Sequence, residues 1–272
     1  MEKKGTPVLT SGINSKICPR SKRSQVTVFI IIGLVVIAVG VLVYFLFPGI
    51  KTSFGVEEET PYQFVEGCLD QDFLQETIND ISLQGGSLNP EHYLVYNGDN
   101  LEYLCYTNEY LKPCVVQQPI LIGHIESEIE NAVRQDADVC LDLMKTHYEE
   151  QGYEVNLRKG GMEVELLPQR IVFRFNSTLV LSKDGDTQNY NLFRVVLNNN
   201  LYELAKIASS IVEWETRYGD AETTLYMSYY RDLKVEKKIQ TEGSTAYILT
   251  DRPSGFKFQF ASRSMPWPPG YG

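Results

Sequence analysis

The sequence predicts an α+β fold, in which an N-terminal transmembrane helix precedes an extracytoplasmic domain of antiparallel strands and about three amphipathic helices. One uncharged apolar run, Val26–Phe47, is long enough to span a bilayer. After it, three segments repeat apolar residues with the period of a helix, and several shorter ones alternate with the period of a strand. These segments occur in blocks, which favours α+β over a parallel βαβ sheet.

The apolar run Val26–Phe47 has 22 residues and no charged side chain. Because a helix rises about 1.5 Å per residue, this length matches a hydrocarbon core of about 30 Å. A cleaved secretory signal is the alternative, but its apolar region usually has about 7–15 residues. The residues around the end of the run, Phe45-Leu46-Phe47-Pro48, also lack the small side chains that a signal peptidase needs. We therefore expect an uncleaved signal-anchor in contact with membrane lipid.

The charges on the two sides of the run predict its orientation. Six of the 25 basic residues and only one of the 35 acidic residues precede it, whereas Glu57, Glu58 and Glu59 follow it closely. Basic residues beside a span stay in the cytoplasm, so the N-terminus is predicted inside and the C-terminal domain outside the cell membrane. The chain after the run carries 19 basic and 34 acidic residues, a formal charge of −15. Such a surface repels nucleic acid, which is not an expected partner.

The chain is expected to have five segments. Pro48-Gly49 breaks the helix after the span, and the last eight residues are too rich in proline for regular structure. The segments are a basic cytoplasmic tail at 1–25, the transmembrane helix at 26–47, a stalk at 48–59, the α+β domain at 60–264 and a Pro/aromatic tail at 265–272.

Three amphipathic helices are expected in the domain. The first starts at Thr60-Pro61, because threonine caps free amide groups and proline fits the first turn, and it ends near Leu83 before Gly85-Gly86. The second runs from about Pro119 to Glu150 and the third from about Asn200 to Tyr218. Their apolar stripes indicate helices laid on a core.

Two groups of strands are expected. A hairpin is predicted where the β-rich runs 92–96 and 101–106 flank Asn97-Gly98. Four strands after the long helix, 153–158, 162–167, 171–181 and 190–197, are predicted to form an antiparallel meander. Two or three final strands are expected at 233–241, 245–250 and 256–261.

The cysteines predict two disulfides. Cys18 lies on the cytoplasmic side and is expected to be a free thiol, whereas the four other cysteines lie outside. Four cysteines allow three connectivities, and spacing alone does not choose among them. The expected elements favour Cys105–Cys114, which closes a short loop, and Cys68–Cys140, which joins two helices. Zinc is disfavoured because the sequence has no Cys-x-x-Cys pair.

The start of the anchor resembles another type of signal. Lys22-Arg23-Ser24-Gln25 directly precedes the apolar helix, which resembles the class III signal peptides of archaeal type IV pilins. The resemblance implies cleavage between Ser24 and Gln25. The chain departs from the pilin pattern at Phe29, where pilins usually carry glutamate, and in having serine before the cut.

A second resemblance covers more of the chain. The anchor Arg-Ser-Gln-Val-Thr-Val-Phe-Ile-Ile-Ile-Gly (23–33), the pair Phe-Val-Glu-Gly-Cys-Leu (64–69) and Leu-Gln-Gly-Gly (83–86), and the ending Phe-Gln-Phe-Ala-Ser-Arg (258–263) resemble uncharacterised single-pass membrane proteins of small-genome archaea. This resemblance implies an archaeal protein that faces the cell surface. It implies no activity.

Few residues qualify as further sites. Asn176-Ser-Thr is an outward glycosylation sequon if its strand turns Asn176 to solvent. His124, Glu126 and Glu128 share a helix and suggest a metal or acid–base group, although a solvated acidic edge is the simpler interpretation. Gly33 and Gly40 lie on one face of the anchor without forming a Gly-x-x-x-Gly motif. No hydrolase, metalloprotease or phosphate-loop motif occurs.

These observations predict a non-enzymatic binding or assembly module of the cell envelope, anchored in the membrane and engaging an envelope protein that the sequence does not identify. No cofactor or metal is expected. Two alternatives stay open. One is a pilin-like subunit or accessory of a type IV filament or secretion system, and the other is an envelope hydrolase whose site assembles from distant residues.

Overall fold

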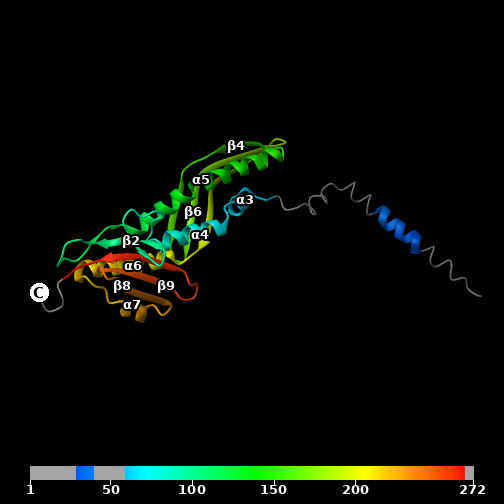
Figure 1. Ribbon diagram of the computed structural model, residues 1–272. Coiled ribbons are helices and arrows are strands. Elements are labelled where there is room, and N and C mark those ends of the chain that lie inside the picture. The colour runs from blue at the N-terminus through cyan, green and yellow to red at the C-terminus, as the bar shows by residue number, and fades with distance from the viewer. Residues whose placement is uncertain (1–28, 40–58, 267–272) are drawn as a thin grey trace, which may run out of the picture. The chain divides into compact units, whose positions relative to one another are not determined.

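The computed structural model describes residues 29–39 and 59–266 (Figure 1). The chain divides into two units, 1–58 and 59–272. In the first unit, residues 29–39 form a helix in which every large apolar side chain is more than half exposed. None of the described helices combines the length and apolar character that crossing a membrane requires. The predicted span Val26–Phe47 extends beyond the described residues on both sides, and the 1–25 tail, the stalk up to residue 58 and the tail from 267 lie outside them.

The second unit has the predicted α+β fold, with two sheets and several helices. The larger sheet has the strand order β1-β2-β10-β9-β8, with β3 beside β2, and the smaller sheet consists of β4 to β7. The strands of the larger sheet are β1 (Tyr93–Tyr96), β2 (Asp99–Tyr106), β3 (Val115–Val116), β8 (Leu233–Ile239), β9 (Ser244–Asp251) and β10 (Lys257–Arg263). Those of the smaller sheet are β4 (Glu154–Arg158), β5 (Met162–Leu167), β6 (Arg170–Lys183) and β7 (Asp186–Asn198).

The first predicted helix is two helices, α3 (Pro61–Cys68) and α4 (Gln71–Leu83). Its predicted start is confirmed, because Thr60 and Gln63 form a reciprocal capping box with Pro61 in the first turn. The prediction of one continuous helix is wrong because Asp70 takes a non-helical conformation, and its carboxylate accepts a hydrogen bond from the Asp72 N–H at 2.9 Å. The chain therefore starts a new helix at this point.

The two other predicted helices are present as α5 (Leu121–Glu150) and α6 (Leu201–Tyr218). The short helix α7 (Thr223–Tyr229) was not predicted, because none of its residues is buried and it shows no apolar stripe. Glycines end the helices as expected. The Gly86 N–H bonds back to the Ile81 carbonyl, and Gly219 takes the left-handed conformation after α6.

The predicted hairpin is confirmed: β1 and β2 are antiparallel, and Asn97 and Gly98 both have positive φ between them. The sheet around the hairpin is mixed rather than purely antiparallel, because β10 runs parallel to β2. β9 pairs antiparallel with both β8 and β10, as the spacing of the last strands predicts.

The predicted meander is wrong in its strand order. β4 and β5 do not pair with each other but lie along the same edge of the long strand β6, while β7 pairs with the opposite edge. Lys159-Gly160-Gly161 therefore follows β6 instead of turning back. Gly160 runs so close to β6 that a Cβ there would lie 1.8 Å from the Asn176 carbonyl oxygen, so only glycine fits.

The helices join the two sheets into one core (Figure 1). α4 and α6 pack on β10 of the larger sheet, α5 packs on β4 and β5 of the smaller one, and α5 also contacts α3, α4 and α6. The largest fully buried side chains come from both sheets and from the helices, among them Phe173, Phe193, Tyr247, Phe258, Phe260, Ile78 and Ile125.

The structure pairs Cys68 with Cys140 and Cys105 with Cys114, as predicted. Cys68, at the end of α3, is bonded to Cys140 of α5, with their Cα atoms 5.7 Å apart. Cys105 of β2 is bonded to Cys114, which precedes β3, with a Cα–Cα distance of 5.4 Å. The first bond fixes the start of the domain to its longest helix, and the second closes a short loop.

Candidate functional site

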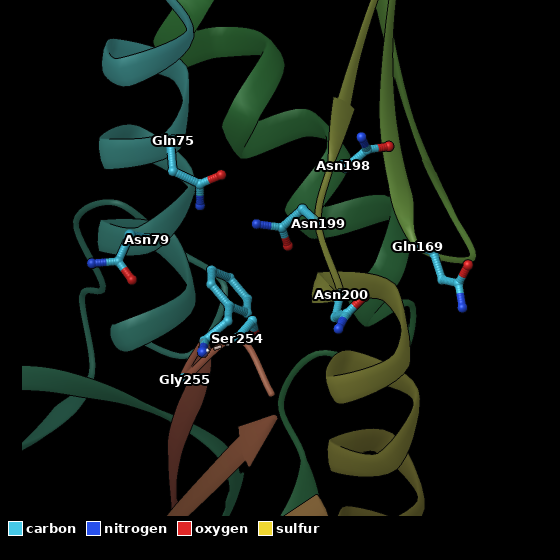
Figure 2. A pocket seen from close by; sticks show the side chains of 9 residues that line it. Gln75, Asn79, Gln169, Asn198, Asn199, Asn200, Ser254 and Gly255 are labelled. Atoms are coloured by element: carbon cyan, nitrogen blue, oxygen red, sulfur yellow. Dashed lines mark hydrogen bonds between the residues drawn. The ribbon is translucent and has the colours of Figure 1, made fainter. Parts of the chain in front are cut away.

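A cavity of about 660 Å³ among the described residues has side-chain amides at six of its nine lining positions. We call it the amide-lined cleft (Figure 2). Three parts of the fold meet there: α4, the turn between β9 and β10, and the junction of β7 with α6, which lies beside the β5–β6 turn. Its lining residues are Gln75, Asn79, Gln169, Asn198, Asn199, Asn200, Ser254, Gly255 and Phe256.

The helix α4 places two amides at the cleft through its periodicity. Leu74 and Ile78 are fully buried in the core, so the residues that follow each of them, Gln75 and Asn79, lie at the edge of the buried face. They are four positions apart, which brings them to neighbouring turns on one side of the helix. Neither side chain has a hydrogen-bond partner within the described chain, and both amides are therefore free for a ligand.

The junction of β7 and α6 supplies three consecutive asparagines. Asn199 is held in place, because its N–H donates to the Gln169 carbonyl at 3.2 Å and its Oδ1 accepts from the Leu201 N–H at 2.7 Å. Asn200 precedes the first turn of α6 but makes no side-chain capping bond. The side chains of Gln75 and Asn199 face one another across the opening (Figure 2).

The β9–β10 turn forms the third wall. Asp251 accepts hydrogen bonds from the N–H and the hydroxyl of Ser254, and the Ser254 hydroxyl accepts one from the Phe256 N–H at 3.1 Å. These bonds fix the turn, which has its left-handed residue at Gly255. Phe256 is half-buried and packs against the main core, so part of its ring remains available at the cleft.

The chemistry of the cleft is neutral and polar. None of its nine lining residues carries a carboxyl, imidazole, amine or thiol group, and the Ser254 hydroxyl is hydrogen-bonded to Asp251. Each carboxamide offers both a carbonyl acceptor and an NH₂ donor. Such a surface can bind a ligand that both donates and accepts hydrogen bonds.

A second cavity, about 400 Å³, adjoins the first and shares Gln169 and Asn200 with it. We call it the acid-lined pocket, because Glu203, Asp232 and Asp251 line it together with Tyr230. Glu203 Oε1 accepts from the Gln169 N–H at 2.9 Å, whereas Glu203 Oε2 is buried without a hydrogen-bond partner among the described residues. A buried acceptor without a donor is rare and needs an explanation.

The predicted group of His124, Glu126 and Glu128 is brought together only in part. His124 and Glu128 line a separate cavity of about 400 Å³, whereas Glu126 points to the smaller sheet and accepts from the Leu166 N–H at 2.8 Å. The new members of the cluster are Ser87 and Glu102, which the sequence did not connect to it. The Ser87 hydroxyl lies 2.6 Å from Glu102 Oε2 and 2.7 Å from His124 Nε2.

The order of these contacts differs from that of a catalytic triad, in which the imidazole stands between hydroxyl and acid. Here the hydroxyl stands in the middle. The Ser87 hydroxyl donates to the Glu102 carboxylate, so its oxygen can accept a hydrogen bond from His124 Nε2 when that nitrogen carries the proton. The neighbouring Leu88 N–H donates to Glu128 at 3.0 Å and is not free to stabilise an oxyanion. The cluster therefore ties α5 to β2 and to the turn after α4. No group of described residues is suited to hold a metal ion.

A buried carboxyl lies elsewhere, under α6. Glu215 is almost fully buried and accepts a hydrogen bond from the Tyr247 hydroxyl. Burial raises the pKa of Glu215, and the Tyr247 bond and the nearby Lys237 charge oppose that rise. Burial also raises the pKa of Tyr247 and lowers that of Lys237. None of these three residues lines the cavities described above. The Tyr247–Glu215 hydrogen bond instead joins β9 to α6 inside the fold.

Of the remaining predicted sites, some lie among the described residues and some lie outside them. Asn176 is exposed on β6, as a glycan would require, and its Nδ2 donates to Glu163 Oε1 at 3.2 Å. Glycosylation itself stays a prediction. Ser24 and Gln25, the predicted processing residues, and Gly40 lie outside the described residues, while Gly33 lies in the helix at 29–39.

Sequence reasoning missed the amide-lined cleft. The sequence predicts a helix start near Asn200 but indicates no role for Asn198, Asn199, Gln75 or Asn79. The run of three asparagines is an unusual signal that points to this place. The other lining residues come from α4 and from two turns that are at least 29 residues away in the chain, and only the fold brings them together.

Compared with protein-family models, with curated protein sequences and with solved structures, the chain matches none. The geometry of the described residues is therefore the basis for a functional proposal.

Proposed function

We propose that the protein is a membrane-anchored, extracytoplasmic module of the cell envelope that binds a neutral polar ligand in the amide-lined cleft without transforming it. The observation that carries this proposal is the lining of the cleft: six carboxamides, one serine hydroxyl, one glycine and one phenylalanine, around about 660 Å³. This volume lies within the about 300–1,000 Å³ typical of ligand sites.

Free carboxamides support the binding role. Among the described residues, the side chains of Gln75, Asn79, Asn198 and Asn200 form no hydrogen bond within the protein, although the cleft places them around one space. A protein that used these amides for its own stability would pair them. Their lack of charge selects against ions, because burying an unpaired charge is costly.

The anchor and the location rest on other observations. The apolar side chains of residues 29–39 are exposed, and such a helix is stable when lipid covers it. The basic residues before the run and the acidic residues after it support an inside N-terminus. Two disulfides in the second unit support an oxidising compartment outside the cytoplasm.

The experiment uses the full-length protein, purified in a zwitterionic detergent and immobilised. Small molecules extracted from the cell envelope are separated into neutral and charged pools, passed over the protein and identified by mass spectrometry after elution. The variant Gln75→Ala/Asn79→Ala removes two cleft amides that have no structural bonds. The matched control is Asn131→Ala/Gln135→Ala, which removes the same residue types at the same spacing from the exposed side of α5.

We expect compounds from the neutral pool to be retained, with unchanged mass, by the wild type and the control but not by the cleft variant. Retention of charged compounds only, equal retention by the cleft variant, or recovery of a chemically altered compound would overturn the proposal. The last result would favour the envelope hydrolase. The pilin-like alternative depends on cleavage after Ser24 and is tested by the state of the N-terminus.

A further inference from the structure

The amide-lined cleft and the acid-lined pocket are adjoining cavities. Gln169 and Asn200 line both, one from the β5–β6 turn and the other from the start of α6. A ligand that fills the first cavity and passes these two residues enters the second. The two cavities thus offer consecutive subsites for an extended ligand.

The two subsites differ in hydrogen-bonding capacity. The carboxamides of the first both donate and accept, whereas the carboxylates of the second only accept when ionised. Asp251 and Glu203 are already engaged through one oxygen each, by Ser254 and by the Gln169 N–H. Glu203 Oε2 has no partner in the described chain and keeps its capacity to accept a hydrogen bond.

Each subsite also presents an aromatic ring. Phe256 is half-buried at the first, and Tyr230 is more than half exposed at the second. An aromatic face packs well against C–H groups, so a ligand with apolar faces and polar edges would use both kinds of contact.

We propose that the two cavities form one groove for a neutral oligosaccharide, with carboxamides binding the hydroxyls of one sugar unit and Glu203 Oε2 accepting a hydrogen bond from a hydroxyl of the next. A sugar carries several neighbouring hydroxyls, each both donor and acceptor, which match the carboxamides. Its ring C–H groups match Phe256 and Tyr230. The inference rests on the proposed function, because it names the class of ligand for the same cleft.

Two other ligand classes use part of this chemistry. A neutral peptide can pair with the carboxamides through its backbone N–H groups and carbonyls. Its carbonyls cannot donate to the carboxylates of the second subsite, so a peptide matches that subsite less well than sugar hydroxyls do. A polyamine satisfies Glu203 but leaves the six carboxamides of the cleft without matching acceptors, because an ammonium group only donates. Both classes serve as comparisons in the test.

The test uses full-length protein in a zwitterionic detergent, because a detergent with a sugar headgroup would compete. An array of neutral glycans identifies the best trisaccharide, and calorimetry measures its affinity beside tetra-alanine and spermidine. Glu203→Gln replaces the unpartnered oxygen by an NH₂ group, and Gln75→Ala/Asn79→Ala alters the first subsite. We expect each change to weaken trisaccharide binding at least about 10-fold, since hydrogen bonds to charged groups and paired amides contribute that much.

Asn131→Ala/Gln135→Ala should leave the affinity unchanged, and a disaccharide that reaches only the first subsite should be insensitive to Glu203→Gln. Thermal unfolding of each variant separates a binding effect from a folding defect. If no neutral glycan binds, or if Glu203→Gln leaves every bound glycan unaffected, the inference is overturned. Binding of tetra-alanine alone would overturn the oligosaccharide and leave the neutral-ligand cleft intact, whereas binding of spermidine alone would overturn both.

Discussion

At the scale of single residues, the polar side chains of this domain divide into those that the fold uses and those that it leaves free. Ser87, Glu102 and His124 bind one another, and Asn199 fixes its own junction. The side chains of Gln75 and Asn79 form no hydrogen bond within the described chain. The distinction separates structural from functional candidates more clearly than residue type does, since asparagine and glutamate occur on both sides of it.

The same distinction explains why the cluster around His124 was only half predicted. Helical spacing places His124 and Glu128 on one face, and the structure confirms that both line one cavity. Ser87 and Glu102 come from other elements, and no local pattern connects them to His124. The contacts of Ser87 with Glu102 and His124 depend on distances that a sequence does not contain.

Gly219 gives the first stability prediction. It has φ +73°, and a Cβ there would lie 2.1 Å from Pro266 Cγ. Gly219→Ala therefore costs the left-handed penalty of about 1–2 kcal/mol and must also displace Pro266. Gly185→Ala is the matched control, because Gly185 has φ +89° with nothing within 4 Å. In urea unfolding we expect the Gly219 variant to lose more stability than the Gly185 variant; equal losses would show that Pro266 does not pack on Gly219.

Glu215 gives a pH-dependent prediction. Its pKa is raised by burial in the folded state, so the unfolded chain releases its proton first, near the ordinary value of 4.5. Folding stability due to Glu215 is thus fully present below pH 4.5 and is lost as pH rises through the higher folded-state pKa. Glu215→Gln keeps an acceptor for the Tyr247 hydroxyl but does not ionise.

Relative to the wild type, Glu215→Gln should therefore gain stability as pH rises above 4.5, by at most about 1.4 kcal/mol per pH unit, and reach a plateau. Denaturant unfolding at pH 4, 5, 6 and 7 measures this difference. The exposed Glu213→Gln serves as control and should show no comparable trend. A stability difference that stays constant over this range would contradict the raised pKa.

At the scale of elements, the sequence predicted the existence and type of most segments, because apolar periodicity and caps are local. The capping box at Thr60, the Asn97-Gly98 turn and the glycines after α4 are confirmed on such local grounds. The order of the strands was not predictable in the same way. β4 and β5 share an edge of β6 because Gly160 can approach the Asn176 backbone, which is a tertiary contact.

The two disulfides give the prediction at this scale. Cys68 and Cys140 are 72 residues apart in the chain, and Cys105 and Cys114 are nine apart. In the chain-entropy description, the longer loop stabilises by about 4.4 kcal/mol and the shorter by about 2.6 kcal/mol. We expect Cys68→Ala/Cys140→Ala to lower the free energy of unfolding more than Cys105→Ala/Cys114→Ala does, as measured by urea unfolding without reductant.

Wild-type protein unfolded with and without reductant provides the control. Reduction should lower its free energy of unfolding at least as much as the Cys68→Ala/Cys140→Ala change does. A larger loss for the Cys105/Cys114 variant would show that local strain, rather than loop length, governs the effect. All four sulfur atoms belong to largely buried residues, so the cavity left by each substitution is similar in kind.

At the scale of the whole molecule, charge and topology act together. The segment before the apolar run is basic and the rest of the chain has a formal charge of −15. This asymmetry predicts the orientation, and an acidic surface also repels anionic headgroups. A neutral ligand is the class least affected by such a field, which agrees with a cleft lined by amides.

The orientation has a direct test, because Cys18 is the only cysteine before the apolar run and the other four are paired. We expect a membrane-impermeant maleimide to label no cysteine on intact cells, and to label Cys18 only after the membrane is permeabilised. Reduction of intact cells before labelling should expose the four outer cysteines and still leave Cys18 unlabelled. Labelling of Cys18 on intact cells would contradict the inside N-terminus.

The intact mass of the same preparation decides between the anchored module and its pilin-like alternative. If the chain is cleaved after Ser24, the measured mass corresponds to a chain that starts at Gln25. Cys18 is then absent, and the maleimide labels no Cys18 even after the membrane is permeabilised. If Cys18 is present and protected, residues 1–24 remain attached and the apolar run acts as an uncleaved anchor. In that arrangement we expect the domain that begins near Glu59 to stay tethered to the outer face of the cell membrane, where tethering would raise its effective concentration towards the envelope ligand proposed for its cleft.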